Sequence, residues 1–91
     1  MKTIWKFELE IKNEQIIEMP KNALILQTAQ IQNGRPVIWA VCDDEEKEKS
    51  NVIILTLGTG NPINVNIQLR FVYIGTYQLG SFVGHVFVKK S

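Results

Sequence analysis

Few residues in this chain are of the types that carry acid–base or nucleophilic chemistry. It has one histidine, His85, and one cysteine, Cys42, while its acidic residues either alternate along the first expected strands or crowd into segment 43–49. A catalytic site needs a nucleophile, a base and a group that orients the base, and no such set can be assigned here. One cysteine and one histidine also cannot form a Cys/His metal site by themselves. We therefore expect a protein that is not an enzyme and has no cofactor.

His85 and Cys42 each have a structural and a functional interpretation. His85 lies in an apolar segment and shares a strand face with Val83 and Phe87. A core or interface histidine is the first interpretation, and a role in ligand binding or proton transfer is the alternative. Four acidic residues follow Cys42 and would raise the pKa of its thiol, which disfavours the reactive thiolate. We expect a buried structural cysteine.

The segment Gly58-Thr59-Gly60-Asn61-Pro62 is the sharpest local feature. Two glycines around a threonine let backbone amides point outward and approach an anion closely. The segment lacks the Lys-Ser/Thr pair of a Walker loop and the three spaced glycines of a dinucleotide motif. It indicates either an anion-binding turn or a plain turn between two strands.

Arginines and aromatic residues supply a second set of candidates. Arg35 and Arg70 are the only arginines. A guanidinium near an aromatic ring can hold a phosphate while the ring stacks on a base, and Trp39, Tyr73 and Tyr77 are candidate rings. The alternatives are solvated arginines and rings that fill the core.

Gly75 and Thr76 lie between the two tyrosines, in the stretch from Tyr73 to Gln78. A glycine within a strand indicates a bulge or a close approach by another part of the chain.

The sequence around these candidate residues predicts strands, which must hold them in position. Apolar and polar residues alternate from Thr3 to Ile11, and a second short strand spans Ile16–Met19 before Pro20. The polar run 13–15 has the length of a hairpin loop, so we expect these first two strands to pair antiparallel.

A second expected hairpin joins Leu24–Gln32 to Val37–Cys42 around Asn33-Gly34, the dipeptide best suited to a tight turn. Because Pro36 restricts the residue before it, we expect this turn to be longer than two residues.

The second half of the chain predicts further strands separated by clear breaks. The segment 43–49 is expected to be a solvated loop or a single helical turn, and Val52–Leu57 a buried strand. Val65, Ile67 and Leu69 alternate with polar residues, which predicts a strand from Asn64 to Arg70. Further strands are expected over Phe71–Leu79 and Phe82–Val88, on either side of the turn Gly80-Ser81.

Together these patterns predict one all-β domain over residues 1–91, with about seven short antiparallel strands in a sandwich or small barrel. The formal net charge of +1 disfavours DNA binding. No apolar run approaches the roughly 18 residues that a membrane span needs. A lone cysteine is typical of a reducing compartment, so we expect a cytoplasmic protein.

Five parts of the sequence carry a resemblance to a known family. They are Lys2–Leu9 (KTIWKFEL), Ile17–Lys21 (IEMPK), Gln32-Asn33-Gly34 with Ile38-Trp39-Ala40, Gly58-Thr59-Gly60, and Tyr73–Leu79 (YIGTYQL). The chain resembles a widespread family of small phage and prophage proteins over nearly its whole length. The segment Asn64–Val72 departs most, because relatives tend to have a shorter and more polar loop there.

The resemblance implies a role in phage immune evasion. Small phage proteins of this kind include sponges, of the anti-CBASS and anti-Thoeris type, that sequester cyclic nucleotide or cyclic ADP-ribose-type signals without cleaving them. Because a 91-residue chain has too little surface to enclose a dinucleotide, we expect a homo-oligomer, a dimer or tetramer, with the pocket at subunit contacts.

The sponge hypothesis gives each candidate residue a role. Backbone amides of the glycine-containing turn and the Thr59 hydroxyl hold phosphate, an arginine neutralises charge, and an aromatic ring stacks on a base. The predicted ligand-binding residues are Arg35, Trp39, Gly58, Thr59, Gly60, Asn61, Arg70, Tyr73, Thr76 and Tyr77. The alternatives are an inhibitor or adaptor that binds a host protein through a strand edge, and a minor structural phage protein.

Overall fold

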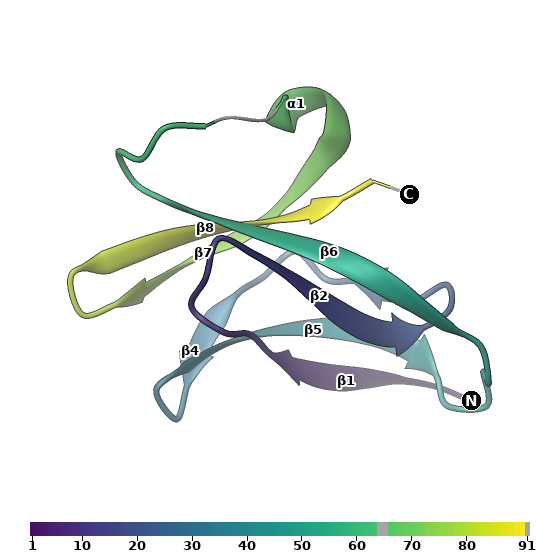
Figure 1. Cartoon of the computed structure of the whole chain (residues 1–91). Coiled ribbons are helices and arrows are strands. Elements are labelled where there is room, and N and C mark those ends of the chain that lie inside the picture. Colours follow the sequence, from purple (N-terminus) through teal and green to yellow (C-terminus); the bar gives the residue numbers. More distant parts are fainter. Residues whose placement is uncertain (64–65, 91) are drawn as a thin grey trace.

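The structure, a computed structural model that describes residues 1–63 and 66–90, contains two antiparallel sheets packed face to face (Figure 1). This confirms the all-β expectation. The strands are β1 (Lys2–Glu8), β2 (Glu14–Pro20), β3 (Leu24–Ile25), β4 (Gln30–Gln32), β5 (Arg35–Asp43), β6 (Lys49–Gly58), β7 (Phe71–Leu79) and β8 (Phe82–Lys89). The described residues form eight strands, because Leu24–Gln32 is divided into β3 and β4, which both pair with β5, while Ile67–Arg70 is not a strand.

The two sheets are built from strands distant in sequence. Sheet A has the order β1-β5-β3, with β4 also on β5, and sheet B has the order β2-β6-β8-β7. The expected pairing of the first two strands is therefore wrong, since β1 pairs with β5 and β2 pairs with β6. Alternation of apolar and polar residues decides which face of a strand is buried, but it does not select the neighbouring strand.

The buried side chain of Gln15 stabilises the crossing from β1 to β2. Its Oε1 accepts a hydrogen bond from the Glu10 backbone N–H at 3.0 Å, and its Nε2 donates to the Glu10 carbonyl oxygen at 2.8 Å. Both backbone groups of Glu10 are therefore satisfied where the chain is in neither sheet. This local contact stabilises the segment between β1 and β2, which lie in different sheets.

The turn between β4 and β5 consists of Asn33 and Gly34. Their φ angles are 51° and 76°, both positive, as a tight two-residue hairpin turn requires. The expectation of a longer turn is wrong because Pro36 lies within the ladder, opposite Ile31, and not in the turn.

After β6 the chain leaves sheet B and arches over its outer face before it returns as β7 (Figure 1). Ile67–Arg70 forms the short helix α1, whose backbone N–H groups at Leu69 and Arg70 both donate to the Asn66 carbonyl oxygen at 3.2 Å. The expected strand is therefore wrong over Ile67–Arg70, and Asn64 and Val65 lie outside the described residues. Within the described ranges, no helix is long and apolar enough to cross a membrane.

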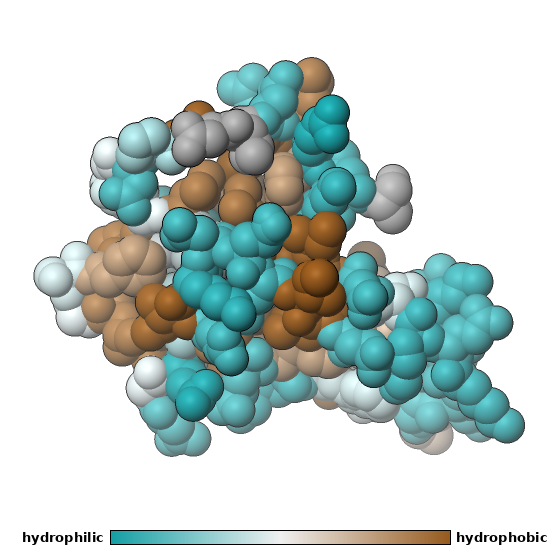
Figure 2. Space-filling view, viewed as in Figure 1, coloured by the Kyte–Doolittle hydropathy of each residue, from teal (hydrophilic) through white to brown (hydrophobic). Residues whose placement is uncertain are grey.

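The core lies between the two sheets. Its most buried large side chains include Leu9, Met19, Ile38, Ile54 and Val86. In each strand, every second side chain points away from the core, to the outer face of its own sheet. Figure 2 shows that exposed hydrophobic side chains on the visible side are bordered by hydrophilic ones. The outer faces are therefore the surfaces where candidate residues are accessible.

Candidate functional site

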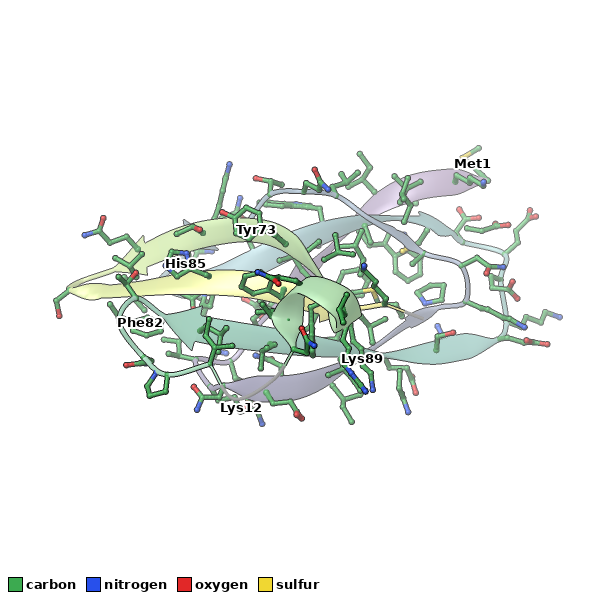
Figure 3. All side chains as sticks on the ribbon, turned by 90° about the horizontal axis from the view of Figure 1, so that it is seen from above. Met1, Lys12, Tyr73, Phe82, His85 and Lys89 are labelled. Atoms are coloured by element: carbon green, nitrogen blue, oxygen red, sulfur yellow. The ribbon has the colours of Figure 1, made fainter. Side chains whose placement is uncertain are left out.

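Both ring nitrogens of His85 are hydrogen-bonded to threonine hydroxyls. Nε2 lies 2.7 Å from Thr59 Oγ1, and Nδ1 lies 3.0 Å from Thr76 Oγ1. Thr76 Oγ1 lies 2.5 Å from the Tyr73 hydroxyl oxygen. We call Thr59, Tyr73, Thr76 and His85 the His85 cluster, and Figure 3 shows its His85 and Tyr73 on neighbouring strands.

A bulge in β7 places Tyr73 and Thr76 on the same face. Side chains three residues apart in a regular strand point to opposite faces. The β7–β8 register shifts between Tyr73 and Gly75, so Tyr73 lies opposite Phe87 and Thr76 lies opposite His85. The extra residue of the bulge thus brings both hydroxyls to the outer face of sheet B.

Gly75 also marks a close approach by another segment. A Cβ at this position would lie 2.7 Å from the backbone nitrogen of Ala29. Both interpretations of this glycine are confirmed, because it combines a bulge with a near backbone neighbour. The approach fixes β7 against the β3–β4 connection and so holds the bulge in place.

The glycine-containing turn after β6 brings Thr59 to His85. The Thr59 N–H donates to the Val83 carbonyl oxygen and the Asn61 N–H donates to the Gly58 carbonyl oxygen, each at 3.1 Å. Contrary to expectation, these two amides are therefore not free for a phosphate. The turn instead presents the Thr59 hydroxyl to the cluster.

Gly58 and Gly60 have different structural roles in this turn. A Cβ on Gly58 would lie 2.7 Å from Asn61 Nδ2 and 3.0 Å from a ring carbon of Phe82, so the glycine makes room for both side chains. Gly60 has a φ of 87°, which glycine adopts without strain. The two glycines thus shape the turn that carries Thr59.

The aromatic candidates are divided between the surface and the core. Tyr73 is 49% exposed, and its ring contacts Phe87 edge-on, with 5.5 Å between the ring centroids. Tyr77 is 3% exposed, and its ring packs over Gly84 on the inner face of the sheet. Tyr73 is therefore the ring available for stacking beside the cluster.

Arg35, Trp39 and Arg70 lie outside the His85 cluster. Trp39 lies between the core residues Ile38 and Ala40 on β5, so it points to the outer face of sheet A, as does Arg35, an even number of residues away. Arg70 is exposed at the end of α1, directly before β7. One chain therefore brings Thr59, Tyr73 and Thr76 together, while Arg35 and Trp39 lie on the opposite side of the sandwich.

The cluster offers several hydrogen-bonding groups on one face of sheet B. Each threonine hydroxyl can either donate to an imidazole nitrogen or accept from it, so both hydroxyls can adapt to the tautomer of His85. No carboxylate or thiol takes part in the hydrogen bonds of the cluster. Within residues 1–63 and 66–90, no group of three or more His, Cys, Asp and Glu side chains is placed to hold a metal ion. The arrangement suits recognition of a polar ligand by several donors and acceptors.

From the sequence, a functional role of His85 is only the alternative to a core or interface position. The structure makes it the centre of the cluster, between hydroxyls from two separate segments. The signal in the sequence was indirect: Gly75 indicated a bulge, and a bulge changes which β7 residues share a face. Without the strand register, this did not identify His85 as their neighbour.

Cys42 is buried in the core, as expected. Its pKa is raised chiefly by burial, while the positive charge of Lys49 acts in the opposite direction. The expectation of a raised thiol pKa is confirmed, although burial rather than the acidic neighbours is the main cause. Cys42 therefore belongs to the structural part of the molecule.

Comparisons with known proteins place the chain in a family. No curated protein and no solved structure significantly matches it. The family model described as "Domain of unknown function (DUF7352)" matches residues 1–91. The chain therefore belongs to the DUF7352 family.

Proposed function

We propose that this protein is a non-catalytic binding protein that sequesters a cyclic nucleotide signal of bacterial antiviral defence. The observation that carries the proposal is the convergence of Thr59, Tyr73 and Thr76 on His85 beside an exposed aromatic ring. Thr59 lies in the turn after β6, and Tyr73 and Thr76 lie on β7. All three are among the residues that the sequence predicts to bind a ligand. The resemblance to phage and prophage proteins supports the biological setting.

In this proposal the ligand base stacks on Tyr73. The ring is half exposed and is held from one side by Phe87, so its orientation is fixed before a ligand arrives. Stacking of a base on an aromatic side chain contributes about 1–3 kcal/mol. The His85 ring orients the hydroxyls of Thr59 and Thr76, whose remaining hydrogen-bonding capacity serves the polar groups of the ligand.

The positive charge for a phosphate comes from outside the hydrogen-bonded cluster. Arg70 precedes β7 by one residue, and Arg35 lies on the opposite outer face, where only a second subunit would bring it to the cluster. A pocket formed between the sheet B face of one subunit and an arginine of another would satisfy this requirement. The proposal therefore includes a homo-oligomer.

The test is thermal unfolding of the purified protein with cyclic dinucleotides, cyclic trinucleotides and cyclic ADP-ribose isomers. A ligand at about a hundred times its Kd adds roughly 2.7 kcal/mol to the free energy of unfolding. We expect one class to raise the melting temperature, and the ligand to be recovered unchanged after denaturation. Absence of a shift for every compound, or recovery of a cleaved product, would contradict the proposal.

Matched variants test the location of the site. Thr76→Val keeps the side-chain shape but removes the hydroxyl that joins His85 to Tyr73, so it should weaken ligand binding about tenfold. Gln78→Ala is the control, because Gln78 is exposed on the same strand and its side chain donates to the Gly80 carbonyl oxygen, outside the His85 cluster. Equal affinity of the two variants would exclude the His85 cluster as the binding site.

A further inference from the structure

A groove of about 610 Å³ opens between the sheets, where β6 begins and β8 ends. Its volume lies in the range of ligand sites. Its walls come from the end of β2 and the segment after it, from the first half of β6, from the first half of β7 and from the end of β8. The lining residues are Pro20, Asn22–Ile25, Ser50–Ile53, Val72, Ile74 and Val88–Lys90. The groove is distinct from the His85 cluster, because Lys89 and His85 lie apart along β8 (Figure 3).

One edge of β6 is without a neighbouring strand inside this groove. β2 pairs with β6 from Lys49 to Leu55, but on the other edge β8 pairs with it only from Ile54 onward. Among the described residues, no other backbone hydrogen bond reaches Ser50–Ile53. The backbone N–H and C=O groups on this edge are therefore available to an added strand.

The side chains of the groove favour an apolar occupant with an anionic end. Leu24 is 64% exposed, and Val72 also exposes much of its side chain at the surface. Lys89 and Lys90 line the end of the groove, none of the lining residues is acidic, and neither lysine forms a salt bridge within the described part of the chain. The complementary ligand thus carries a negative charge near the end of β8.

The free strand edge distinguishes a peptide from a hydrocarbon chain. A fatty acyl chain would cover backbone N–H and C=O groups of β6 without bonding to them, which is unfavourable. An extended peptide would pair with those groups while its alternate side chains entered the apolar groove. We infer that the groove binds an extended apolar peptide segment of another protein, which adds a strand to β6 and places an acidic residue beside Lys89 and Lys90.

The experiment uses the full chain and synthetic peptides with blocked ends. The probe is Asp-Val-Thr-Val-Thr-Val, and its controls carry Asn or Lys in place of the first residue. Titrations followed by amide NMR shifts should show millimolar or tighter binding of the acidic peptide, with the largest changes at Ser50–Ile53. N-methylation of alternate peptide nitrogens on the pairing edge should abolish binding. Dodecanoate serves as the hydrocarbon control.

A charge reversal tests the lysines. The variant Lys89→Glu/Lys90→Glu alters two exposed side chains, so the fold should be retained. It should bind the acidic peptide about fivefold more weakly than the unaltered protein and should prefer the peptide that begins with Lys. Lys12→Glu is the control, because Lys12 is exposed and is not a lining residue.

The inference is overturned by any of three results. These are no binding of the acidic peptide, equal binding of the N-methylated peptide, and tighter binding of dodecanoate than of the peptide. A failure here leaves the nucleotide proposal standing, since the His85 cluster shares no residue with the groove.

Discussion

At the scale of single residues, two hydroxyls are buried, whereas the amide of the buried Gln15 side chain is hydrogen-bonded. Thr56 Oγ1 and Tyr77 Oη have no hydrogen-bond partner among the residues that the structure describes. Both side chains pack against Gly84, where a Cβ would lie 3.0 Å from Thr56 and 2.9 Å from Tyr77. A buried hydroxyl without a partner costs about 1–3 kcal/mol of stability.

Thr56→Val should therefore stabilise the protein. The substitution keeps the branched shape and removes the unpartnered oxygen, so we expect the free energy of unfolding to rise by about 1 kcal/mol. Urea unfolding measures this difference. Thr59→Val is the control, because the Thr59 hydroxyl is bonded to His85 and its loss should bring no such gain. A destabilised Thr56→Val protein would show that the Thr56 hydroxyl has a partner.

Gly84→Ala tests the close packing around the same position. The added methyl group would meet side-chain atoms of Phe82, Tyr77 and Thr56 at 3.0 Å or less. Overpacking of a dense core costs about 1–3 kcal/mol, so thermal unfolding should show a lower melting temperature. Gly34→Ala is the control for backbone strain without crowding, because Gly34 has a φ of 76° and an added Cβ would have no atom within 4 Å. An unchanged melting temperature for Gly84→Ala would contradict the packing described here.

At the scale of elements, one side chain stabilises the crossing between β1 in sheet A and β2 in sheet B. Gln15 is 7% exposed and satisfies both backbone groups of Glu10 at the crossing. A residue without an amide would leave the Glu10 N–H without its partner, while the Glu10 carbonyl oxygen would keep the hydrogen bond from the Lys12 N–H at 3.1 Å. The crossing segment is thus stabilised by a local contact rather than by a ladder.

Gln15→Leu should destabilise the protein by about 1 kcal/mol or more, because the Glu10 N–H loses its only acceptor among the described residues. Chemical unfolding measures the loss, and hydrogen exchange should increase at Glu10. Gln78→Leu provides the control at an exposed position. If Gln15→Leu were as stable as the unaltered protein, hydration would be sufficient to satisfy Glu10.

Local signals predicted the strands and turns of this fold better than they predicted pairing. Asn33-Gly34 and Gly80-Ser81 mark turns in the sequence because positive φ angles need special residues, and both turns are observed. The partner of each early strand was not predictable, since alternation carries no information about the neighbour. The helix α1 was missed because the apolar positions Ile67 and Leu69 also fit a strand of period two.

The candidate site was predicted only in part, because the strand register that brings its residues together could not be predicted. Residue types selected Thr59, Tyr73 and Thr76, but their meeting at His85 depends on a bulge and on the β7–β8 register. Arg35 and Trp39 were grouped with them by chemistry alone. These two residues lie on the other outer face because β5 pairs within sheet A. Such long-range pairing could not be predicted from the sequence patterns.

At the scale of the whole molecule, the closed core makes stability sensitive to alkaline pH. Burial raises the pKa of the Cys42 thiol above its ordinary value of 9.0 and that of the Tyr77 hydroxyl above 10.0. Both groups retain their protons to higher pH in the folded protein than in the unfolded chain. The unfolded state therefore binds fewer protons in this range, and stability falls as pH rises.

We expect the free energy of unfolding to decrease from pH 8 upward through about pH 9 and again above about pH 10. Urea unfolding across this range measures the slope. Cys42→Ala should remove the first decrease and Tyr77→Phe the second, which separates these groups from lysine titration. Equal slopes in all three proteins would mean that neither buried group is responsible.

The order of the strands along the chain also has a consequence for synthesis. All strands of sheet A lie before residue 44, so this sheet can assemble while the rest is still being translated. β2 is made early too, but its neighbour β6 begins only at Lys49. A nascent chain therefore carries one strand with both edges open for an interval. Three residues of β2 protect that strand from pairing with other nascent chains. Glu14 and Glu18 carry like charges, and Pro20 cannot donate a backbone hydrogen bond to a neighbouring strand.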